Sequence, residues 1–416
     1  MADVIEGNLG KGHHEIGAEK LVRRLSMVVL LEWMGAGIVL PLLPIYLKDQ
    51  GISTGFVGVT MAAFYFAGLC LQYPAGHLVD RIGKRPILIG GLIAYGAASL
   101  AYLLPTGPWI FLVLRFIQGA AAGAVEVAAL ALVSSAIPLD ERGQATSKIY
   151  SGMFIGIFLG PVFGAAVGVH HMGLLFVFTA VICTIAAIPV ITSSAIRAHD
   201  KIHVPEEGAL EQVRIDKAMV GAMLIGSTLG LATGVYEACW SMLMEAKGAS
   251  AFQIGLSWAV FSLPYIFLVR ITGWMTDHWD RRYMAVGGVT ISMCLFLMWP
   301  HINSPNVMIG LNIFEAIAYS LILPSAQSIL TGGRPDEVMG RVQGIYATSN
   351  TATIAFSAVA AGFLFGVGNW IPFTLTAPLG IGSAVAAVVL WRKVPGRVAD
   401  VESHHVGEAP FHHHEH

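Results

Sequence analysis

Long apolar runs are the feature that most constrains this chain of 416 residues. Hydrophobic residues make up 55% of it and charged residues only 12%, against roughly 25% charged residues in soluble domains. A membrane-spanning helix needs about 20 mostly apolar residues. Twelve runs of this kind lie near 25–47, 55–79, 86–105, 108–136, 146–169, 172–192, 218–244, 253–276, 283–302, 305–331, 341–366 and 370–392. The sequence therefore predicts an all-α membrane protein with twelve transmembrane helices.

The two halves of the chain share a pattern of residues at a constant offset of 197. The matched pairs are Gly51 with Gly248, Ser53 with Ser250, Gly58 with Gly255, Gly76 with Gly273, Asp80 with Asp277 and Arg85 with Arg282. Such a repeat indicates two copies of one structural plan. We predict two pseudo-symmetric six-helix bundles at 25–192 and 218–392, a linker at 193–217, an N-terminal segment at 1–24 and a tail at 393–416.

Basic residues are distributed unevenly between the two sides of the predicted membrane. One side collects 20 of the 24 Lys and Arg residues, whereas the other holds only Lys48 and Lys247. Short basic loops remain in the cytoplasm. We therefore expect a multi-pass protein of the cytoplasmic (bacterial inner) membrane, with both termini and the linker in the cytoplasm and no cleavable signal peptide.

The most specific motif lies in the loop between the second and third runs. It comprises Gly76, Asp80, Arg81, Gly83, Lys84 and Arg85. It resembles the cytoplasmic loop signature of the major facilitator superfamily, whose acidic and basic residues form a charge cluster that latches the outward-facing state. A degraded copy contains Gly273, Asp277, Arg281 and Arg282, with Asp280 in place of the second glycine. An alternative is that these charges only orient the loop.

A second motif lies in the fourth run, where Arg115 is followed by Gln118 and Glu126. It resembles the arginine-bearing fourth-helix signature of proton-coupled exporters in the same superfamily. At 100° per residue, Arg115 and Glu126 share one helix face and lie about 16 Å apart along the axis. An arginine inside a membrane helix marks a substrate or ion pathway by default, although a structural role bonded to carbonyl oxygens is the alternative.

Glycines recur every four residues in the fifth run. The stripe contains Gly152, Gly156, Gly160 and Gly164, with Pro161 beside it. Small residues at this spacing allow another helix to approach the backbone closely. The stripe resembles the fifth-helix antiporter signature of exporters in the superfamily, and the matching stretch near 357–362 lacks it. In the first run, the segment 35–44 with Pro41 and Pro44 resembles the twelve-helix drug:proton antiporter branch, and we expect both prolines to bend the helix.

Four acidic residues lie inside predicted helices that line the central cavity in this superfamily: Glu32, Glu126, Glu237 and Glu315. Intramembrane acids are costly and commonly functional. An apolar environment disfavours the charged form of a carboxyl group, so such an acid can exchange its proton for a cation. Aromatic or soft side chains suited to lipophilic cations accompany them: Trp33, Met34, Phe64, Tyr65, Tyr236, Trp240, Trp258 and Tyr319. Packing or lipid contact is the alternative role for each.

The polar tail contains several histidines, among them His412, His413, His414 and His416. They could bind a nickel- or cobalt-like metal ion, as in nickel exporters of the superfamily with His-rich tails, or they could be an added tag. This leaves export of a divalent metal or a metal chelate as the alternative function.

Together these patterns predict a secondary active transporter that exports a small lipophilic or cationic compound in exchange for protons. The expected partners are the substrate, protons and the lipid bilayer, with a metal ion at the tail as a candidate, and we expect no cofactor and no nucleic acid. A membrane enzyme or assembly factor is a third interpretation, but we find no convergent acid, base and nucleophile for one.

Overall fold

The computed structural model describes residues 2–104, 107–137, 142–198, 200, 215–334 and 336–396. Within these ranges every regular element is helical. The first half contains α1 (Ala2–Val39), α2 (Leu43–Asp49), α3 (Thr54–Ile82), α4 (Lys84–Ala101), α5 (Pro108–Ala136), α6 (Arg142–Val167), α7 (Met172–Thr192) and the short α8 (Ser194–Ala198). The second half contains α9 (Lys217–Val235), the π-helical turn η2 (Tyr236–Trp240), α10 (Ser241–Ala246), α11 (Ala251–His278), α12 (Arg281–Met298), α13 (Pro305–Thr331), α14 (Asp336–Val367) and α15 (Ile371–Leu390).

These helices account for all twelve predicted runs. In the described residues, eleven helical segments are long and apolar enough to cross a membrane. The run that falls short is α4, which has 18 residues and begins with Lys84 and Arg85. These two charges lower its mean hydropathy, yet α4 packs between α5 and α7 like the other helices. The predicted irregularity in the first run is also present, because α1 ends before Pro41 and α2 begins beside Pro44.

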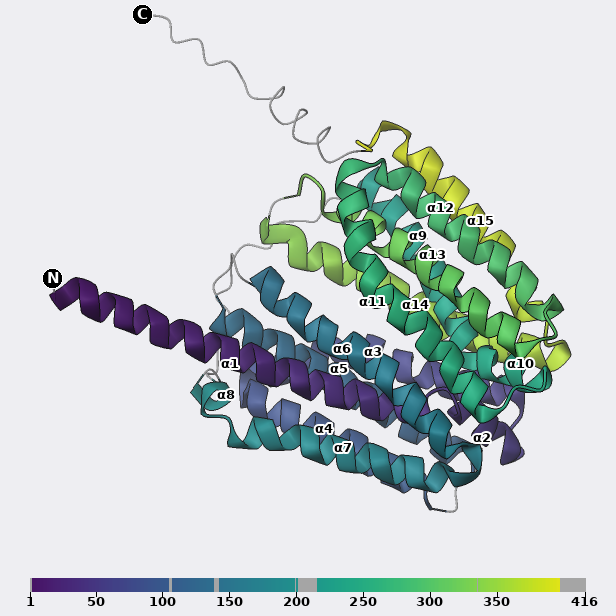
Figure 1. The fold of residues 1–416 in the computed structure, drawn as a ribbon, viewed down its shortest axis with the longest axis horizontal. Coiled ribbons are helices and arrows are strands. Elements are labelled where there is room, and N and C mark those ends of the chain that lie inside the picture. The colour runs from purple at the N-terminus through teal and green to yellow at the C-terminus, as the bar shows by residue number, and fades with distance from the viewer. Residues whose placement is uncertain are drawn as a thin grey trace, which may run out of the picture.

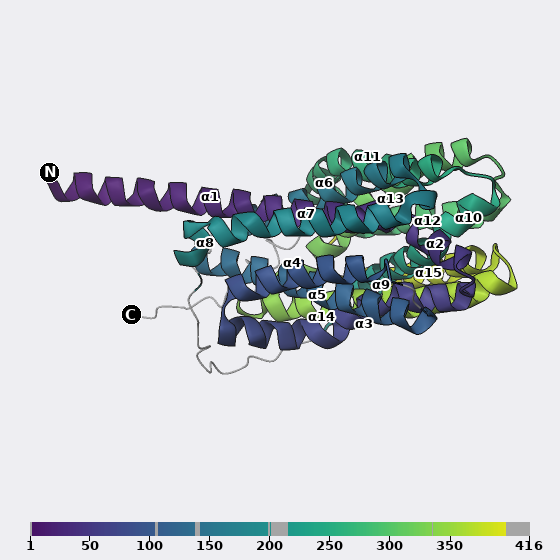
Figure 2. The same ribbon diagram turned by 90° about the horizontal axis from the view of Figure 1, so that it is seen from below.

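The same helix pairings recur in the two halves. In the first half α1 packs against α6, α3 against α5 and α4 against α7; in the second half α9 packs against α14, α11 against α13 and α12 against α15. Between the halves, α3 contacts α14 and α6 contacts α11, again as a reciprocal pair. Figures 1 and 2 show the resulting two bundles side by side. The predicted architecture of two pseudo-symmetric bundles is confirmed.

The repeat extends to the residues that begin the second helix of each half. Ser53 caps α3 by accepting a hydrogen bond from the backbone N–H of Phe56, and Ser250 caps α11 in the same way. The preceding Gly51 and Gly248 adopt φ angles of 78° and 82°, a region that favours glycine. The glycines and serines that match in the sequence therefore form equivalent turns and helix caps in the structure.

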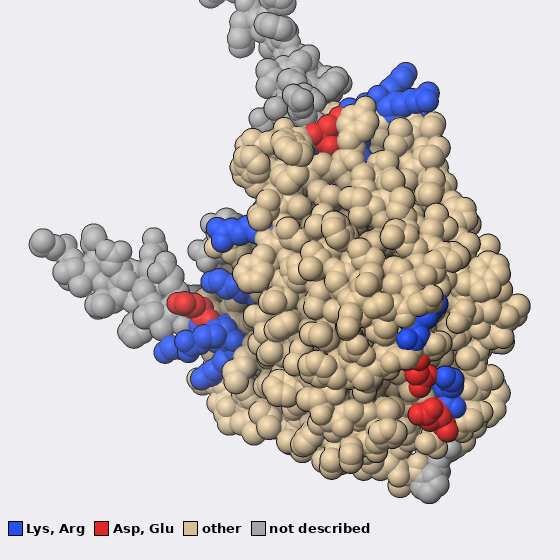
Figure 3. All heavy atoms as spheres, turned by 45° about the vertical axis from the view of Figure 1, so that its right-hand side comes forward, with Lys and Arg blue, Asp and Glu red and all other residues tan. Residues whose placement is uncertain are grey.

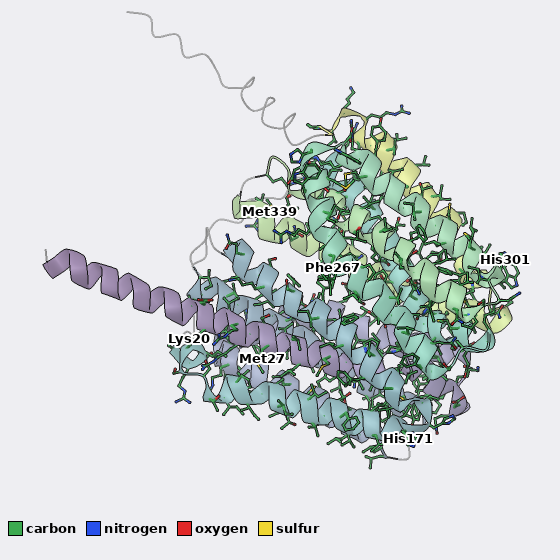
Figure 4. All side chains as sticks on the ribbon, in the orientation of Figure 1. Lys20, Met27, His171, Phe267, His301 and Met339 are labelled. Atoms are coloured by element: carbon green, nitrogen blue, oxygen red, sulfur yellow. The ribbon has the colours of Figure 1, made fainter. Side chains whose placement is uncertain are left out.

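Charged side chains lie near the two ends of the molecule and leave a broad uncharged belt between them in the view of Figure 3. We call the end with the loops 81–85 and 281–282 the basic end, and the end with α2 and α10 the opposite end. Figure 4 shows Lys20 and Met339 at the basic end on different bundles, whereas His171 and His301 lie at the opposite end. This distribution suits a protein that presents its uncharged belt to lipid.

The glycine stripe of α6 forms the interface with α1. A side chain at Gly152, Gly156, Gly160 or Gly164 would collide with the carbonyl oxygens of Ser26, Leu30, Met34 and Ile38, respectively. Both series advance by four residues, so the two helix backbones run in contact over three turns. The stripe therefore sets the distance between α1 and α6.

In the second half, the equivalent helices α9 and α14 also pack closely, but the glycines lie on α9, the counterpart of α1. The stretch of α14 near 357–362 lacks a glycine stripe, but Gly226, Gly230 and Gly234 of α9 face α14 at the same four-residue spacing. An added side chain at Gly230 would lie 2.6 Å from the carbonyl oxygen of Asn350. The two halves thus share close packing between equivalent helices while differing in which helix provides the glycines.

The contacts between the two halves gather towards the opposite end. Lys48 of α2 forms an ion pair of 2.6 Å with Glu245 of α10, and these residues are themselves 197 positions apart. A side chain at Gly58 of α3 would lie 2.8 Å from the Cα atom of Gly362 in α14. From this end the bundles diverge towards the basic end (Figure 1). The structure is therefore closed at the opposite end.

We predict that Gly156→Ala lowers the thermal stability of the protein. Its methyl group would collide with the carbonyl oxygen of Leu30, and such overpacking costs about 1–3 kcal/mol. The melting temperature of the purified protein in detergent measures this effect. Gly287→Ala is the matched control, because nothing lies within 4 Å of the added methyl group. Equal melting temperatures for the two variants would contradict the interpretation.

We also predict that Lys48→Glu opens the opposite end. The reversal replaces an attraction with repulsion from Glu245, and an exposed pair of this kind contributes up to about 1 kcal/mol, or roughly a fivefold change in population. Distances between spin labels at Trp109 and Trp370, exposed at this end of the two halves, should shift to longer values. The double exchange Lys48→Glu with Glu245→Lys should restore the original distribution. If the double exchange did not restore the distances, the ion pair would not be what keeps the opposite end closed.

Candidate functional site

A cavity of about 100 Å³ lies among α9, η2, α11 and α13 in the second half. Its lining is mainly aromatic and includes Thr233, Tyr236, Glu237, Trp240, Ser257, Trp258, Phe261, Asn312 and Tyr319. Four of the aromatic residues singled out in the sequence therefore surround one cavity. A mostly apolar cavity with a few polar groups is the usual form of a small-molecule site.

Glu237 is the acid that lies in this cavity. The π-helical turn η2 carries it, and π-helical turns in α-helices occur frequently at functional sites. Glu237 is only 7% exposed, and its Oε1 atom accepts a hydrogen bond of 3.0 Å from the hydroxyl group of Tyr65 on α3. Its Oε2 atom is buried and has no hydrogen-bond partner among the described residues. The carboxylate thus joins the two halves through one oxygen, while the other is unpaired among the described residues.

Arg115 lies on the first-half side of the interface and is 4% exposed. Its guanidinium group stacks over Phe64 at 4.5 Å from the ring centroid and donates a hydrogen bond of 3.3 Å to Gln118. The amide of Gln118 in turn donates to the hydroxyl group of Ser99 at 3.0 Å. The positive charge of Arg115 acts on Glu237 across the interface. The predicted pair Arg115 and Gln118 is therefore a packed unit beside the cavity.

Glu32 and Glu126 form a separate acidic pair in the first half. Glu32 of α1 is 2% exposed and lies close enough to Glu126 of α5 for their charges to repel one another. Glu126 accepts a hydrogen bond of 3.4 Å from the hydroxyl group of Tyr150 on α6. The Oε1 atom of Glu32 has no partner in the described part of the chain. Two buried carboxyl groups without a cation between them can share protons.

Glu315 lies apart from both groups. It is fully buried, and its Oε1 atom accepts a hydrogen bond of 2.6 Å from Ser292 on α12. It is absent from the residues that line the cavity. Glu32 and Glu126 thus lie within electrostatic range of one another, as do Arg115 and Glu237, whereas Glu315 lies between α12 and α13.

At the basic end of the first half, the motif residues connect three helices. Gly83 has a φ of 99° between α3 and α4, a conformation that favours glycine. Arg85 donates to the carbonyl oxygens of Val190 and Ile191 at 3.1 and 2.8 Å, and its backbone N–H donates to Asp200. Asp80 makes no hydrogen bond or ion pair with another residue in the described ranges. The latch between Asp80 and Arg85 stays a prediction for another conformation.

The second copy of the motif makes the same kind of connection. Arg282 donates to the carbonyl oxygens of Trp391 and Val394 at 3.2 and 3.0 Å, as Arg85 does at the end of its own half. It also pairs with Asp280 at 2.6 Å. Partial burial disfavours the charged form of Asp280, but the hydrogen bonds from Arg282 outweigh it and lower the pKa of this carboxyl group. Arg281 is buried and donates to the carbonyl oxygen of Ser328 at 2.9 Å.

The remaining motif positions differ in their surroundings. Gly76 and Gly273 face open space. Arg81 and Asp277 are exposed, whereas Lys84 is buried. These positions stay predictions as gate residues.

Sequence reasoning missed several polar partners of the site. Asn312 lines the cavity and is 3% exposed, and its amide nitrogen has no partner among the described residues. Tyr150 and Ser292, which bond to Glu126 and Glu315, were also not singled out. An uncharged polar residue in an apolar run is the signal that could have found Asn312.

The histidines of the tail, including His412, His413, His414 and His416, lie outside the described residues. Within the described ranges, no group of three or more His, Cys, Asp or Glu side chains converges as a metal site would.

Comparison with known proteins agrees with the superfamily that the sequence motifs resemble. The sequence profile of the Major Facilitator Superfamily matches residues 25–238 and 222–412. Multidrug resistance protein 2 of Bacillus subtilis (strain 168) is 22% identical over 356 residues, covering 83% of this chain and 88% of the relative. The class E tetracycline resistance protein of Escherichia coli is 24% identical over 404 residues, covering 91% and 96%.

Solved structures agree in fold at low identity. The nucleoside transporter NupG superposes with a TM-score of 0.71 at 11% identity, covering 89% of this chain and 99% of the other. An inward-facing, occupied bacterial homologue of the human lysosomal transporter Spinster gives a TM-score of 0.69 at 10% identity, covering 92% and 96%. At these identities the likeness concerns the fold alone.

Proposed function

Because the chain belongs to the major facilitator superfamily of membrane transporters, we propose that it exports a small lipophilic cation in exchange for protons. The observation that carries this proposal is the buried carboxylate of Glu237. One of its oxygens has no partner among the described residues and lies in an aromatic cavity. A buried carboxylate without a partner is unfavourable when charged, so it binds either a proton or a cation.

The surroundings of Glu237 suit an organic cation better than a bare metal ion. The rings of Trp240, Phe261 and Tyr319 line the same cavity, and aromatic faces attract cations while contacting apolar groups. A metal ion would need several hard or borderline ligands, and Glu237 is the only carboxylate among the lining residues. The chemistry therefore favours a substrate with one positive charge and an apolar body.

The acidic pair in the first half supports proton coupling. Glu32 and Glu126 lie near each other without a basic partner in the described part of the chain. We propose that they hold the exchanged proton and that Arg115, which is beside the cavity, adjusts the affinity of Glu237 for the cation. Entry of a proton in one half and a cation in the other would then favour different relative positions of the bundles.

The proposed orientation and the conformation fit one state of an alternating-access cycle. If the basic end is cytoplasmic, the structure is closed to the outside and the bundles diverge towards the cytoplasm (Figure 1). A hollow lined by Met223, Arg341 and Ser349 lies on α9 and α14 near that end. Rocking of the bundles would reverse this arrangement, with Asp80 and Arg85 forming the cytoplasmic latch in the outward-facing state.

The proposed export rather than import rests on two further features. The glycine stripe of α6 resembles the exporter signature and packs against α1 along its length. Two relatives of similar length carry the names multidrug resistance protein and tetracycline resistance protein. Metal export keeps only the histidine tail in its favour.

We predict that Glu237→Gln weakens binding of a lipophilic cation by at least about tenfold, because it removes the one negative charge of the cavity. Equilibrium binding of tetraphenylphosphonium to the purified protein measures this. Asp49→Asn, which neutralises an exposed acid at the opposite end, is the matched control. Unchanged affinity in the Glu237 variant would refute the proposed cation site.

We predict that Glu126→Gln retains cation binding but abolishes coupled exchange. In proteoliposomes with an internal pH dye, lipophilic cations should dissipate an imposed proton gradient with the natural protein and not with the variant. Glu19→Gln, an exposed acid of α1, should behave as the natural protein does. Undiminished exchange in the Glu126 variant would remove this residue from the mechanism. If Ni²⁺ dissipated the proton gradient, and did so less after deletion of residues 402–416, the result would instead support metal export.

A further inference from the structure

We infer that the cavity selects cations that also carry an oxygen acceptor, and that Trp258 and Asn312 make this selection. The inference rests on the proposed function and narrows it to a substrate class. The substrate would combine a single positive charge, an aromatic ring and a carbonyl, ester or similar oxygen.

The indole of Trp258 differs from those of the tryptophans around it. Trp240 donates its Nε1–H to Ser257 at 2.8 Å, and Trp299 donates to the hydroxyl oxygen of Tyr236 at 2.8 Å. The Nε1 atom of Trp258, a half-buried residue, is itself buried but has no acceptor among the described residues. A buried indole usually finds a hydrogen-bond partner. This one lines the cavity, so an occupant of the cavity can provide it.

Asn312 of α13 provides the second unpaired group. It is 3% exposed, and its Nδ2 atom is buried without a partner in the described ranges. Other polar groups of the cavity are paired, since the hydroxyl groups of Thr233 and Tyr319 lie 3.1 Å apart. Unpaired donors are therefore found on Trp258 and Asn312 and not on every polar residue that lines the cavity.

The three unpaired groups together define the chemistry that one ligand would need. The Oε2 atom of Glu237 requires a positive charge, whereas Trp258 and Asn312 offer hydrogen-bond donors in the same cavity. A buried donor left unpaired is unfavourable by about 1–3 kcal/mol. A site built from such groups rejects an analogue that lacks the matching oxygen. A purely hydrocarbon cation would bind through its charge and its rings but would leave both donors unpaired.

A matched pair of cations tests this selection. Benzoylcholine and 4-phenylbutyltrimethylammonium have the same ring, the same trimethylammonium group and chains of equal length, but only the first has an ester. Their dissociation constants for the full chain in lipid nanodiscs can be compared by calorimetry. We expect benzoylcholine to bind at least about tenfold more tightly, which corresponds to one additional hydrogen bond.

Two variants test whether Trp258 and Asn312 cause the preference for benzoylcholine. Trp258→Phe and Asn312→Leu should each reduce the ratio of the two dissociation constants to below about threefold, and Asn312→Leu provides an independent result where the tryptophan variant is unstable. Trp279→Phe, an exposed tryptophan outside the cavity, should leave the ratio unchanged. Glu237→Gln should weaken both cations together.

The outcomes separate this inference from the function on which it rests. Equal affinities in the natural protein, or a ratio that neither variant changes, would overturn the role of Trp258 and Asn312 while leaving a cation site in place. Failure of both compounds to bind would overturn the cation site itself, and with it the selection.

Discussion

The structure depends on one constraint: a polar group inside an apolar interior is stable only with a partner. Most buried polar side chains obey it, as shown by Gln118 bonded to Ser99 and by Trp240 bonded to Ser257. Some exceptions lie apart, on Glu32, Glu315 and Tyr346, but three of them lie together. Glu237, Trp258 and Asn312 each carry an unpaired buried atom among the described residues and line one cavity. A ligand that completes these bonds explains their position better than three unrelated defects.

A second constraint is that the helices of each bundle approach at backbone distance. On α6 the glycines leave no room for side chains against α1, and on α9 they do the same against α14. These contacts make each bundle a rigid unit, because a packed helix pair has few alternative arrangements. The contacts between bundles are fewer and include an exposed ion pair, Lys48 with Glu245, which contributes little stability. Movement is therefore expected between the bundles rather than within them.

The sequence was sufficient for the fold because its signals are local. Twelve apolar runs, a constant offset and the prolines of the first run determine which segments form helices and which turns recur. The site was predicted less completely, because hydropathy does not fix how a helix is rotated. All four acids were expected on helices that line the cavity, and Glu237 lies in the cavity on the π-helical turn. Glu315 does not line this cavity and instead accepts a hydrogen bond from Ser292. Asn312 carries no charge and was overlooked.

The positions of the acids have a consequence for coupling. Glu32 and Glu126 lie in the first bundle, and the cavity with Glu237 lies in the second. If a proton and a cation occupy different bundles, neither can displace the other by direct competition at one atom. The exchange must then pass through the interface, where Tyr65 of the first bundle donates a hydrogen bond to Glu237 of the second. In the proposed exchange, a cation that takes over this carboxylate would weaken this contact between the bundles, and binding would thereby favour opening of the closed side.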